Sequence, residues 1–296
     1  MATSGTVSGA WPERAGAMAK RLELTGAGWL LVRVAAGLAL CALSGGQSLG
    51  QSVPVASLTP PAAPNAPLKP YLAQTALPDS VALLKPPPAA KSPAEARDQA
   101  LARAAHALLG NPRWDQAKRD ADLFSPRATS GFSCAAGREI SPSATPFTDR
   151  LLRRAMIDFA AATSAAKAKY QRARPFMTDG KPICTPDMAA GLRANGSYPS
   201  GHAAIGQGWG LVLAALVPAH KAALLARGKD FGDSRRVCNV HWASDVAAGQ
   251  LVAQATYRVL LKDTAFSTDL AAARTELANV RPVVPDCTAE KAGLKR

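Results

Sequence analysis

Apolar residues recur at helical spacing through most of this chain from about residue 92 onward, and this repeat constrains the fold more than any other feature. No run of residues alternates strictly between apolar and polar, and no hairpin signal appears. The sequence therefore predicts an all-α fold, a compact multi-helix bundle. The long candidate helices cover residues 94–109, 148–174, about 202–217 and 241–262, with a last helix starting near Ser267.

Glycine and proline set the expected helix boundaries. The first long helix should stop at Gly110-Asn111-Pro112, and Pro175 should block the second after residue 174. Thr185 followed by Pro186 is typical of an N-cap with a proline in the first turn. A short helix is therefore expected to begin there and to end near Gly196.

The N-terminal region has the pattern of an export signal. Lys20 and Arg21 precede a ten-residue apolar stretch at 34–43, and small residues follow it. The stretch is shorter than the ~20 apolar residues of a membrane span, so no stable membrane insertion is expected. A lipid anchor on Cys41 is a weaker alternative, because the bulky Leu40 precedes it. The chain is predicted to be periplasmic or secreted. Its expected parts are a signal peptide with an N-terminal extension (1–50), a Pro/Ala-rich linker (51–70) and a single all-α domain (71–296).

Four cysteines remain after the predicted signal peptide, at positions 134, 184, 238 and 287. An even number in an exported chain predicts two disulfides, with three connectivities open. Metal ligation is the weaker alternative, because no two cysteines have the close C-x2-C spacing of a zinc site.

The formal net charge of +14 favours an anionic partner: a phosphate ester, nucleic acid or an anionic membrane surface. Aromatic residues make up only 5% of the chain and are not interleaved with the basic ones, which argues against single-stranded nucleic acid. A solvated basic surface without a partner is the alternative interpretation of the charge.

Three motifs follow one another in the second half of the chain, and together they have the composition of a phosphate-binding site with a histidine nucleophile. They are Lys167-x6-Arg174-Pro175, then Pro199-Ser200-Gly201-His202, then Ser234-Arg235-x5-His241-x3-Asp245. Any one of them could occur by chance, but the three in this order are a strong signal.

The first two motifs supply groups that bind an anion. Lys167 and Arg174 are seven residues apart, so within one helix both would project from the same face. An exposed basic helix face is the alternative, and Arg172 is interpreted in that way. Ser200 and Gly201 enter an apolar helix, whose first-turn N–H groups would face an anion, with His202 beside it. Ordinary helix capping by Ser200 is the alternative.

The third motif supplies the nucleophile. His241 and Asp245 are an i, i+4 pair, so the carboxylate can hold one ring nitrogen and leave the other free to attack. Arg235 is expected on the loop that enters this helix. A purely structural His-Asp pair is the alternative, and Trp242 is interpreted as packing.

These motifs resemble those of the type 2 phosphatidic acid phosphatase superfamily, which also includes the vanadium haloperoxidases. Within it, the chain resembles the class A bacterial non-specific acid phosphatases from about Tyr71 to about Leu261. Residues 196–202, Gly-Ser-Tyr-Pro-Ser-Gly-His, agree with the class signature, and Ala203 replaces the threonine that usually follows.

The resemblance implies that His241 attacks phosphorus to form a phosphohistidine, that Asp245 orients it and that His202 protonates the leaving alcohol. It implies metal-independent hydrolysis of phosphate monoesters at acid pH, with no cofactor and with phosphotransfer as a side activity. A homo-oligomer remains an alternative to a monomer. The phosphate-binding groups would be Lys167, Arg174, Ser200, Gly201 and Arg235.

Two other functions fit parts of the sequence. A vanadate-dependent haloperoxidase would use the same anion site, although the chain is short for that family. An exported anion-binding protein with degenerate motifs would have the same charge, but no catalytic position of the three motifs is substituted here.

Overall fold

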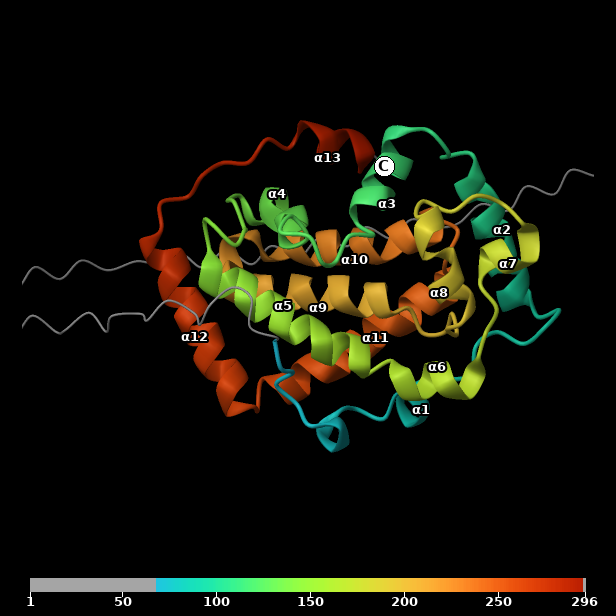
Figure 1. The fold of residues 1–296 in the computed structure, drawn as a ribbon, viewed down its shortest axis with the longest axis horizontal. Helices are drawn as coiled ribbons and strands as arrows, with labels where there is room; N and C mark the ends of the chain where they lie inside the picture. Colours follow the sequence, from blue (N-terminus) through green and yellow to red (C-terminus); the bar gives the residue numbers. More distant parts are fainter. Residues whose placement is uncertain (1–67, 295–296) are drawn as a thin grey trace, which may run out of the picture. The chain divides into compact units, whose positions relative to one another are not determined.

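The helix that begins at Gly201 lies at the centre of the fold in a computed structural model, which describes residues 68–294. This helix, α9 (Gly201–Leu216), packs against three others, as Figure 1 shows. They are α5 (Pro146–Ala161), α10 (Lys221–Val237) and α11 (Ala243–Leu260). Because α9 is surrounded, it is apolar nearly all round and most of its residues are buried.

Large side chains fill the space between these helices, and glycines bring the backbones together. Trp209 of α9 is fully buried; its indole N–H donates to Leu152 O at 2.8 Å, and its ring packs against Phe231 of α10. A Cβ on Gly210 would lie 2.8 Å from Leu224 O, and one on Gly228 would lie 2.7 Å from Gly206 O. Only glycine permits α9 and α10 to approach this closely.

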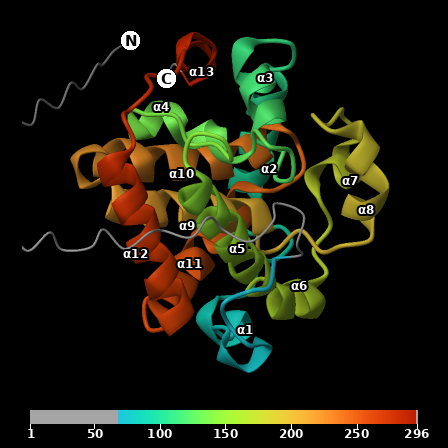
Figure 2. The ribbon, with the colours of Figure 1, turned by 60° about the vertical axis from the view of Figure 1, so that its left-hand side comes forward.

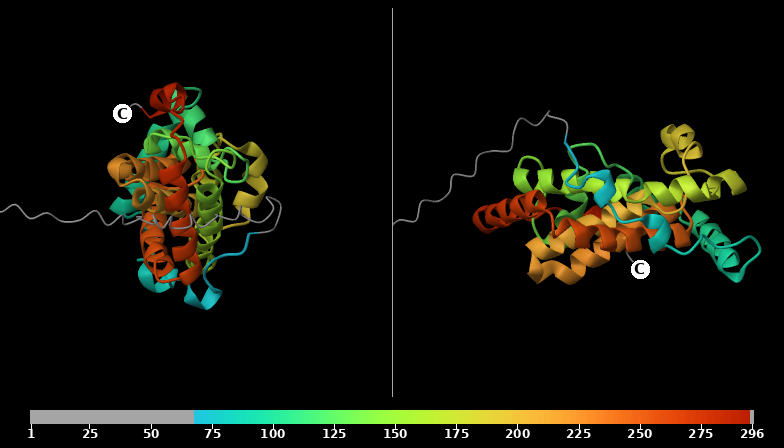
Figure 3. Two further views of the ribbon diagram at one scale, coloured as in Figure 1. Left: turned by 90° about the vertical axis from the view of Figure 1, so that its left-hand side faces the viewer. Right: turned by 90° about the horizontal axis from the view of Figure 1, so that it is seen from below.

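Shorter helices and α12 (Thr264–Asn279) surround this bundle. α12 packs against α5 at one end, while α7 and α8 lie at the opposite end (Figures 1 and 3). Figure 2 shows α3 and α13 together beside α4 and α10. The remaining α-helices are α1 (Ser80–Leu83), α2 (Pro93–His106), α3 (Pro112–Arg119), α4 (Ser133–Ala136), α6 (Ser164–Tyr170), α7 (Pro175–Asp179), α8 (Ala189–Arg193) and α13 (Thr288–Gly293). Short 3₁₀ helices span Gln74–Ala76, Thr129–Phe132, Pro186–Met188 and Pro218–His220.

The predicted all-α class is confirmed: residues 68–294 contain no strand. The helices expected from about 202 and 241 correspond to α9 and α11, and the one expected near Ser267 begins at Thr264. α2 ends at His106, before the expected residue 109, and Asn111 starts α3, because its Oδ1 accepts from the N–H groups of Arg113 and Trp114. Helix α10 was not expected, since charged residues and two glycines interrupt its apolar pattern.

The single helix predicted over 148–174 is wrong. α5 ends at Ala161 and α6 covers Ser164–Tyr170, after which Gln171 adopts the left-handed conformation with a φ of 42°. The chain then turns away, and Arg174 stands at the N-cap of α7. Pro175 is therefore at the start of a new helix and not beyond the end of an old one.

Two disulfides, Cys134–Cys287 and Cys184–Cys238, give one of the three connectivities that the sequence allowed. The first joins α4 to the segment before α13, and the second joins the segment between α7 and α8 to the end of α10.

The residues described belong to one compact unit. The predicted signal peptide (1–50) and nearly all of the predicted linker lie outside them, and the boundary near residue 70 stays a prediction. Within residues 68–294, no helix has the length and apolarity needed to cross a membrane.

Candidate active site

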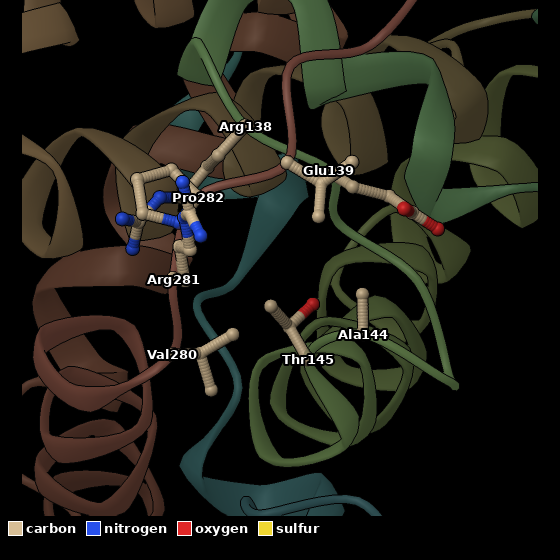
Figure 4. A pocket seen from close by; sticks show the side chains of 8 residues that line it. Arg138, Glu139, Ala144, Thr145, Val280, Arg281 and Pro282 are labelled. Atoms are coloured by element: carbon tan, nitrogen blue, oxygen red, sulfur yellow. The ribbon is translucent and has the colours of Figure 1, made fainter.

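A cavity of about 580 Å³ lies at the N-terminus of α9, and five of the eight predicted site residues line it. They are Lys167, Arg174, Gly201, His202 and His241. The other three, Ser200, Arg235 and Asp245, are fully buried behind this lining. A smaller pocket of about 150 Å³, between the chain after α12 and the loop before α5, contains none of them (Figure 4).

The hydrogen bonds of His241 define its tautomer. Its Nε2 lies 2.9 Å from Arg174 Nη1, which can only donate, so Nε2 is the unprotonated nitrogen. Its Nδ1 lies 3.2 Å from Ser197 Oγ and 3.5 Å from Asp245 Oδ2. Because Ser197 donates its own proton to Asp245 Oδ2, its oxygen can accept from Nδ1–H. The lone pair of Nε2 is thus directed away from the carboxylate.

Asp245 occupies the first turn of α11 and not the i+4 position of a helix containing His241, which precedes that helix by two residues. Its Oδ2 accepts from Trp242 N at 2.8 Å, and its Oδ1 accepts from Arg172 Nη1 at 2.7 Å. Each carboxylate oxygen therefore has fixed donors, which hold the side chain in one orientation beside His241.

The sequence predicted that Arg172 would lie on an exposed basic helix face, and this prediction is wrong. Only 12% of its side chain is exposed, and it forms ion pairs with Asp245 and with Asp98 of α2 at 2.7 and 2.9 Å. Asp98 Oδ1 also accepts from Ser244 N at 2.9 Å, in the first turn of α11. A buried network thus connects α2 to the Asp245 carboxylate.

Lys167 and Arg174 do not share a helix face, because the chain turns between them, yet both point to one backbone carbonyl. Gly196 O accepts from Lys167 Nζ at 2.8 Å and from Arg174 Nη2 at 3.4 Å. Arg174 is held further by Leu192 O at 2.7 Å and Val240 O at 2.9 Å. Burial and the neighbouring charge of Arg174 lower the pKa of Lys167 to about 7, and burial lowers the pKa of Arg174 to about 10.

Arg235 lies in the last turn of α10, not on the loop after it, and its side chain is completely buried. Burial and the charge of Arg174 lower its pKa to about 10. Among residues 68–294, no hydrogen-bond acceptor reaches its Nε or Nη2. Unpaired buried guanidinium nitrogens are costly, so they are suited to an anionic partner.

Ser200 caps α9: its Oγ accepts from Ala203 N at 3.3 Å. The capping alternative is therefore correct for this contact, and the hydroxyl proton of Ser200 remains available to donate. Gly201, the first residue of α9, contributes an N–H without an acceptor inside the helix. The positive end of the helix dipole adds to the electrostatic attraction for an anion.

His202, the next residue of α9, also lines the cavity, and its Nε2 lies 3.2 Å from Ala121 O. Burial and the charge of Arg235 lower the pKa of His202 well below its usual range. Burial and the charge of Arg174 do the same to His241. Both imidazoles are therefore neutral at pH 7 when no anion is bound.

Gly249 of α11 allows the backbone of this helix, which carries Asp245, to pack closely against Ser200 at the start of α9. A Cβ at this position would lie 2.2 Å from Ser200 O. The backbones are also joined directly, because Ser200 N donates to Asp245 O at 2.9 Å. The contact of α11 with the start of α9 thus sets the distance between the two histidines.

Three residues of this site were missed by reasoning from the sequence: Ser197, Arg172 and Asp98. Ser197 belongs to the 196–202 signature, so its position was a usable signal. Arg172 and Asp98 are 74 residues apart and carry no spacing pattern.

Among residues 68–294, no three His, Cys, Asp or Glu side chains are grouped so that they could hold a metal ion.

The chain matches the profile of the PAP2 superfamily over residues 154–268. It is 39% identical over 203 residues to an acid phosphatase of Zymomonas mobilis, which covers 69% of this chain and 77% of that protein. It is 40% identical to a non-specific acid phosphatase of Salmonella typhimurium over 66% of this chain and 78% of that one. A non-specific acid phosphatase of Providencia stuartii is 38% identical over 71% of this chain and 86% of that protein. The chain therefore belongs to the PAP2 superfamily and, within it, to the bacterial acid phosphatases.

Proposed function

We propose that this chain hydrolyses phosphate monoesters of broad specificity at acid pH, without a metal, through a phosphohistidine on His241. The observation that carries the proposal is the pairing of His241. One ring nitrogen is held by Ser197 and Asp245, and the other, unprotonated, belongs to a cavity lined with cations. This arrangement fits a nucleophile for an anionic electrophile.

In the first step, Nε2 of His241 attacks phosphorus as the bond to the ester oxygen breaks. Attacking and leaving atoms are roughly in line during phosphoryl transfer, so the alcohol leaves on the side opposite His241, taking a proton from His202. Lys167, Arg174, Arg235, the Ser200 hydroxyl and the Gly201 N–H hold the three equatorial oxygens. Donors fixed before the reaction stabilise the charge that develops there.

In the second step, water attacks the phosphohistidine, His202 accepts its proton, and inorganic phosphate leaves while His241 is regenerated. An alcohol in place of water would give phosphotransfer by the same route. The lowered pKa of His202 supports an acid optimum, because its imidazole is protonated only at acid pH.

We also propose that the chain works in the periplasm or outside the cell. The two disulfides support an oxidising compartment. The charged pattern before residues 34–43 supports export.

Release of phosphate from p-nitrophenyl phosphate between pH 4 and 9 in excess EDTA tests the proposed activity. We expect turnover with a maximum on the acid side, and its loss in the His241→Ala variant with the fold retained by circular dichroism. Activity that disappears in EDTA and returns with a divalent cation would contradict the metal-free mechanism. Peroxide-dependent halide oxidation after addition of vanadate, without phosphate release, would favour a haloperoxidase.

A further inference from the structure

Arg172 lies behind the active-site cavity, yet it contacts both groups that support the ring of His241, namely Ser197 and Asp245. We propose that Arg172 positions the nucleophile by fixing these two supports, and that Asp98 of α2 holds Arg172 in the required orientation. This inference rests on the proposed phosphatase function of His241. It adds to the reaction two positioning residues that are not fixed positions of the three sequence motifs.

The main chain of Arg172 fixes Ser197. Ser197 N donates to Arg172 O at 2.8 Å, which holds the segment after α8 against the turn after α6. The hydroxyl of the same serine contacts Nδ1 of His241 and donates to Oδ2 of Asp245. A shift of the backbone at Arg172 would therefore move the hydroxyl that accepts from the histidine ring.

The guanidinium of Arg172 connects two carboxylates. Its Nη1 donates to Asp245 Oδ1 at 2.7 Å, and its Nη2 donates to Asp98 Oδ2 at 2.9 Å. Nη1 also donates to Ser244 Oγ at 2.7 Å, and that hydroxyl donates in turn to Asp98 Oδ2. Because a guanidinium is planar and its donors have fixed directions, it aligns the two carboxylates relative to each other. The Asp245 side chain therefore cannot rotate without breaking its contact with Arg172.

Asp98 attaches this arrangement to α2. Its side chain is only 4% exposed, and its Oδ1 accepts from Ser244 N at 2.9 Å in the first turn of α11. Arg172 and the start of the helix that carries Asp245 thus share one anchor. Loss of the Asp98 charge would leave Arg172 with Asp245 as its one carboxylate partner among residues 68–294. We therefore expect Asp98 to affect the nucleophile through Arg172 and the first turn of α11.

The charge of Arg172 is important because the Asp245 side chain is completely buried. Burial raises the pKa of Asp245, and the charge of Arg172 is the largest of the influences that lower it. Without Arg172, the carboxyl would take up a proton at a higher pH and would no longer stabilise positive charge on the His241 ring. The other titratable groups near this carboxylate are Asp98, His241, Lys167, Arg174 and Tyr198.

The test measures kcat for p-nitrophenyl phosphate against pH in full-length variants. Arg172→Gln removes both the charge and the paired donors, so kcat should fall about 10²-fold with little change in KM. The low-pH side of its profile should move toward neutral pH by about one pH unit, because the carboxyl protonates earlier as the pH falls. Arg172→Lys keeps the charge but not the planar donors, so kcat should fall while the low-pH side stays in place. Asp98→Asn should behave like Arg172→Lys.

Added guanidinium ion distinguishes positioning from a purely structural role. In Arg172→Ala, guanidinium chloride far below the concentration that unfolds the protein should restore part of kcat. Sodium chloride or urea at the same concentration should not. Arg154→Ala is the matched control, because it removes another partly buried arginine, paired with Asp269 at 3.1 Å and outside the cavity lining. It should leave kcat and the pH profile unchanged.

Three results would overturn the positioning role and leave the proposed function standing, provided that the parent protein is active and His241→Ala is not. The first is a parental kcat and pH profile in Arg172→Gln. The second is a loss of kcat that matches the loss of folded protein by circular dichroism, without a shifted profile and without rescue. The third decides the question if Arg172→Gln does not fold, and it is a parental kcat in Arg172→Lys. Turnover by His241→Ala would overturn both proposals.

Discussion

The charge on Lys167 depends on pH within the range in which the enzyme would work. Most lysines stay protonated at neutral pH, but burial and Arg174 bring the pKa of this one to about 7. Since its pKa is lowered, the positive charge is complete below pH 7 and is lost as the pH rises through that value. The phosphate site therefore loses one of its cations above neutrality.

We predict that sulfate, a dianion of constant charge, inhibits more weakly as the pH rises from 6 to 8. The pKa values of the two histidines are also lowered, well below 6.5, so a variant at Lys167 is needed to separate its titration from theirs. Lys167→Arg should flatten the dependence, since a guanidinium stays protonated. A sulfate inhibition constant that does not change between pH 6 and 8 in the parent protein would contradict the assignment.

Ser197 is expected to act on the rate constant for chemistry more than on binding. Its Oγ lies between His241 Nδ1 and Asp245 Oδ2. In Ser197→Ala, Nδ1 would lose this hydroxyl and would keep, among the described residues, its 3.5 Å approach to Asp245 Oδ2. A misaligned nucleophile can lose about 10²-fold in rate. We predict a fall in kcat of that order with little change in KM. Ser133→Ala, which removes another buried hydroxyl away from the cavity, is the matched control.

At this scale the fold brings together residues that the sequence selected, but in relationships that the sequence did not predict. Five of the eight predicted residues line one cavity, and the other three are buried. The assumption that Lys167 and Arg174 share a helix face was wrong, because Gln171 adopts a left-handed conformation that no local signal marked. The Asp98–Arg172–Asp245 network depends on tertiary contacts between α2 and α11 and could not be read from spacing.

Among the helices, the close approach of α11 to the start of α9 brings the two histidines together. Gly249→Ala would place a methyl group 2.2 Å from Ser200 O, which the backbone can relieve only by moving α11 away. Overpacking of this kind costs about 1–3 kcal/mol. We predict a loss of stability of that size in urea unfolding, together with a larger loss of activity than stability alone explains.

Gly191→Ala is the control for that substitution, because its Cβ would meet nothing within 4 Å on helix α8. It should be neutral or stabilising by up to about 1 kcal/mol. If the two variants behave alike, the close contact of Gly249 is not what positions α11.

The helices themselves were predictable to different degrees. α9 and α11 have long apolar stretches, so their periodicity was clear. α10 is rich in charged residues, including the buried Arg227 that pairs with Asp120, and its glycines serve packing against α9. Both features obscure an apolar repeat, which explains why this helix was missed.

For the whole molecule, the two disulfides are expected to contribute differently. Cys134–Cys287 closes a loop of sequence separation 153, and Cys184–Cys238 one of 54. Removing a native disulfide costs about 2–5 kcal/mol, more for the longer loop in the chain-entropy model. We predict that Cys134→Ser/Cys287→Ser lowers the free energy of unfolding by that amount.

Cys184→Ser/Cys238→Ser should lower activity as well as stability, because Cys238 lies between Arg235 and His241 in the sequence. A free thiol at one of these four cysteines in the native protein would contradict the pairing that includes it.

The central claim, that His241 carries the phosphoryl group, is tested most directly by trapping the intermediate. The enzyme would be mixed with a phosphate monoester, quenched into alkali, in which phosphohistidine is stable, and digested for mass spectrometry. We predict that the peptide containing His241 gains the mass of one phosphoryl group, and that the His241→Ala variant shows no such gain on any peptide. A phosphoryl group on another residue during turnover would contradict the account, as would turnover by the His241→Ala variant.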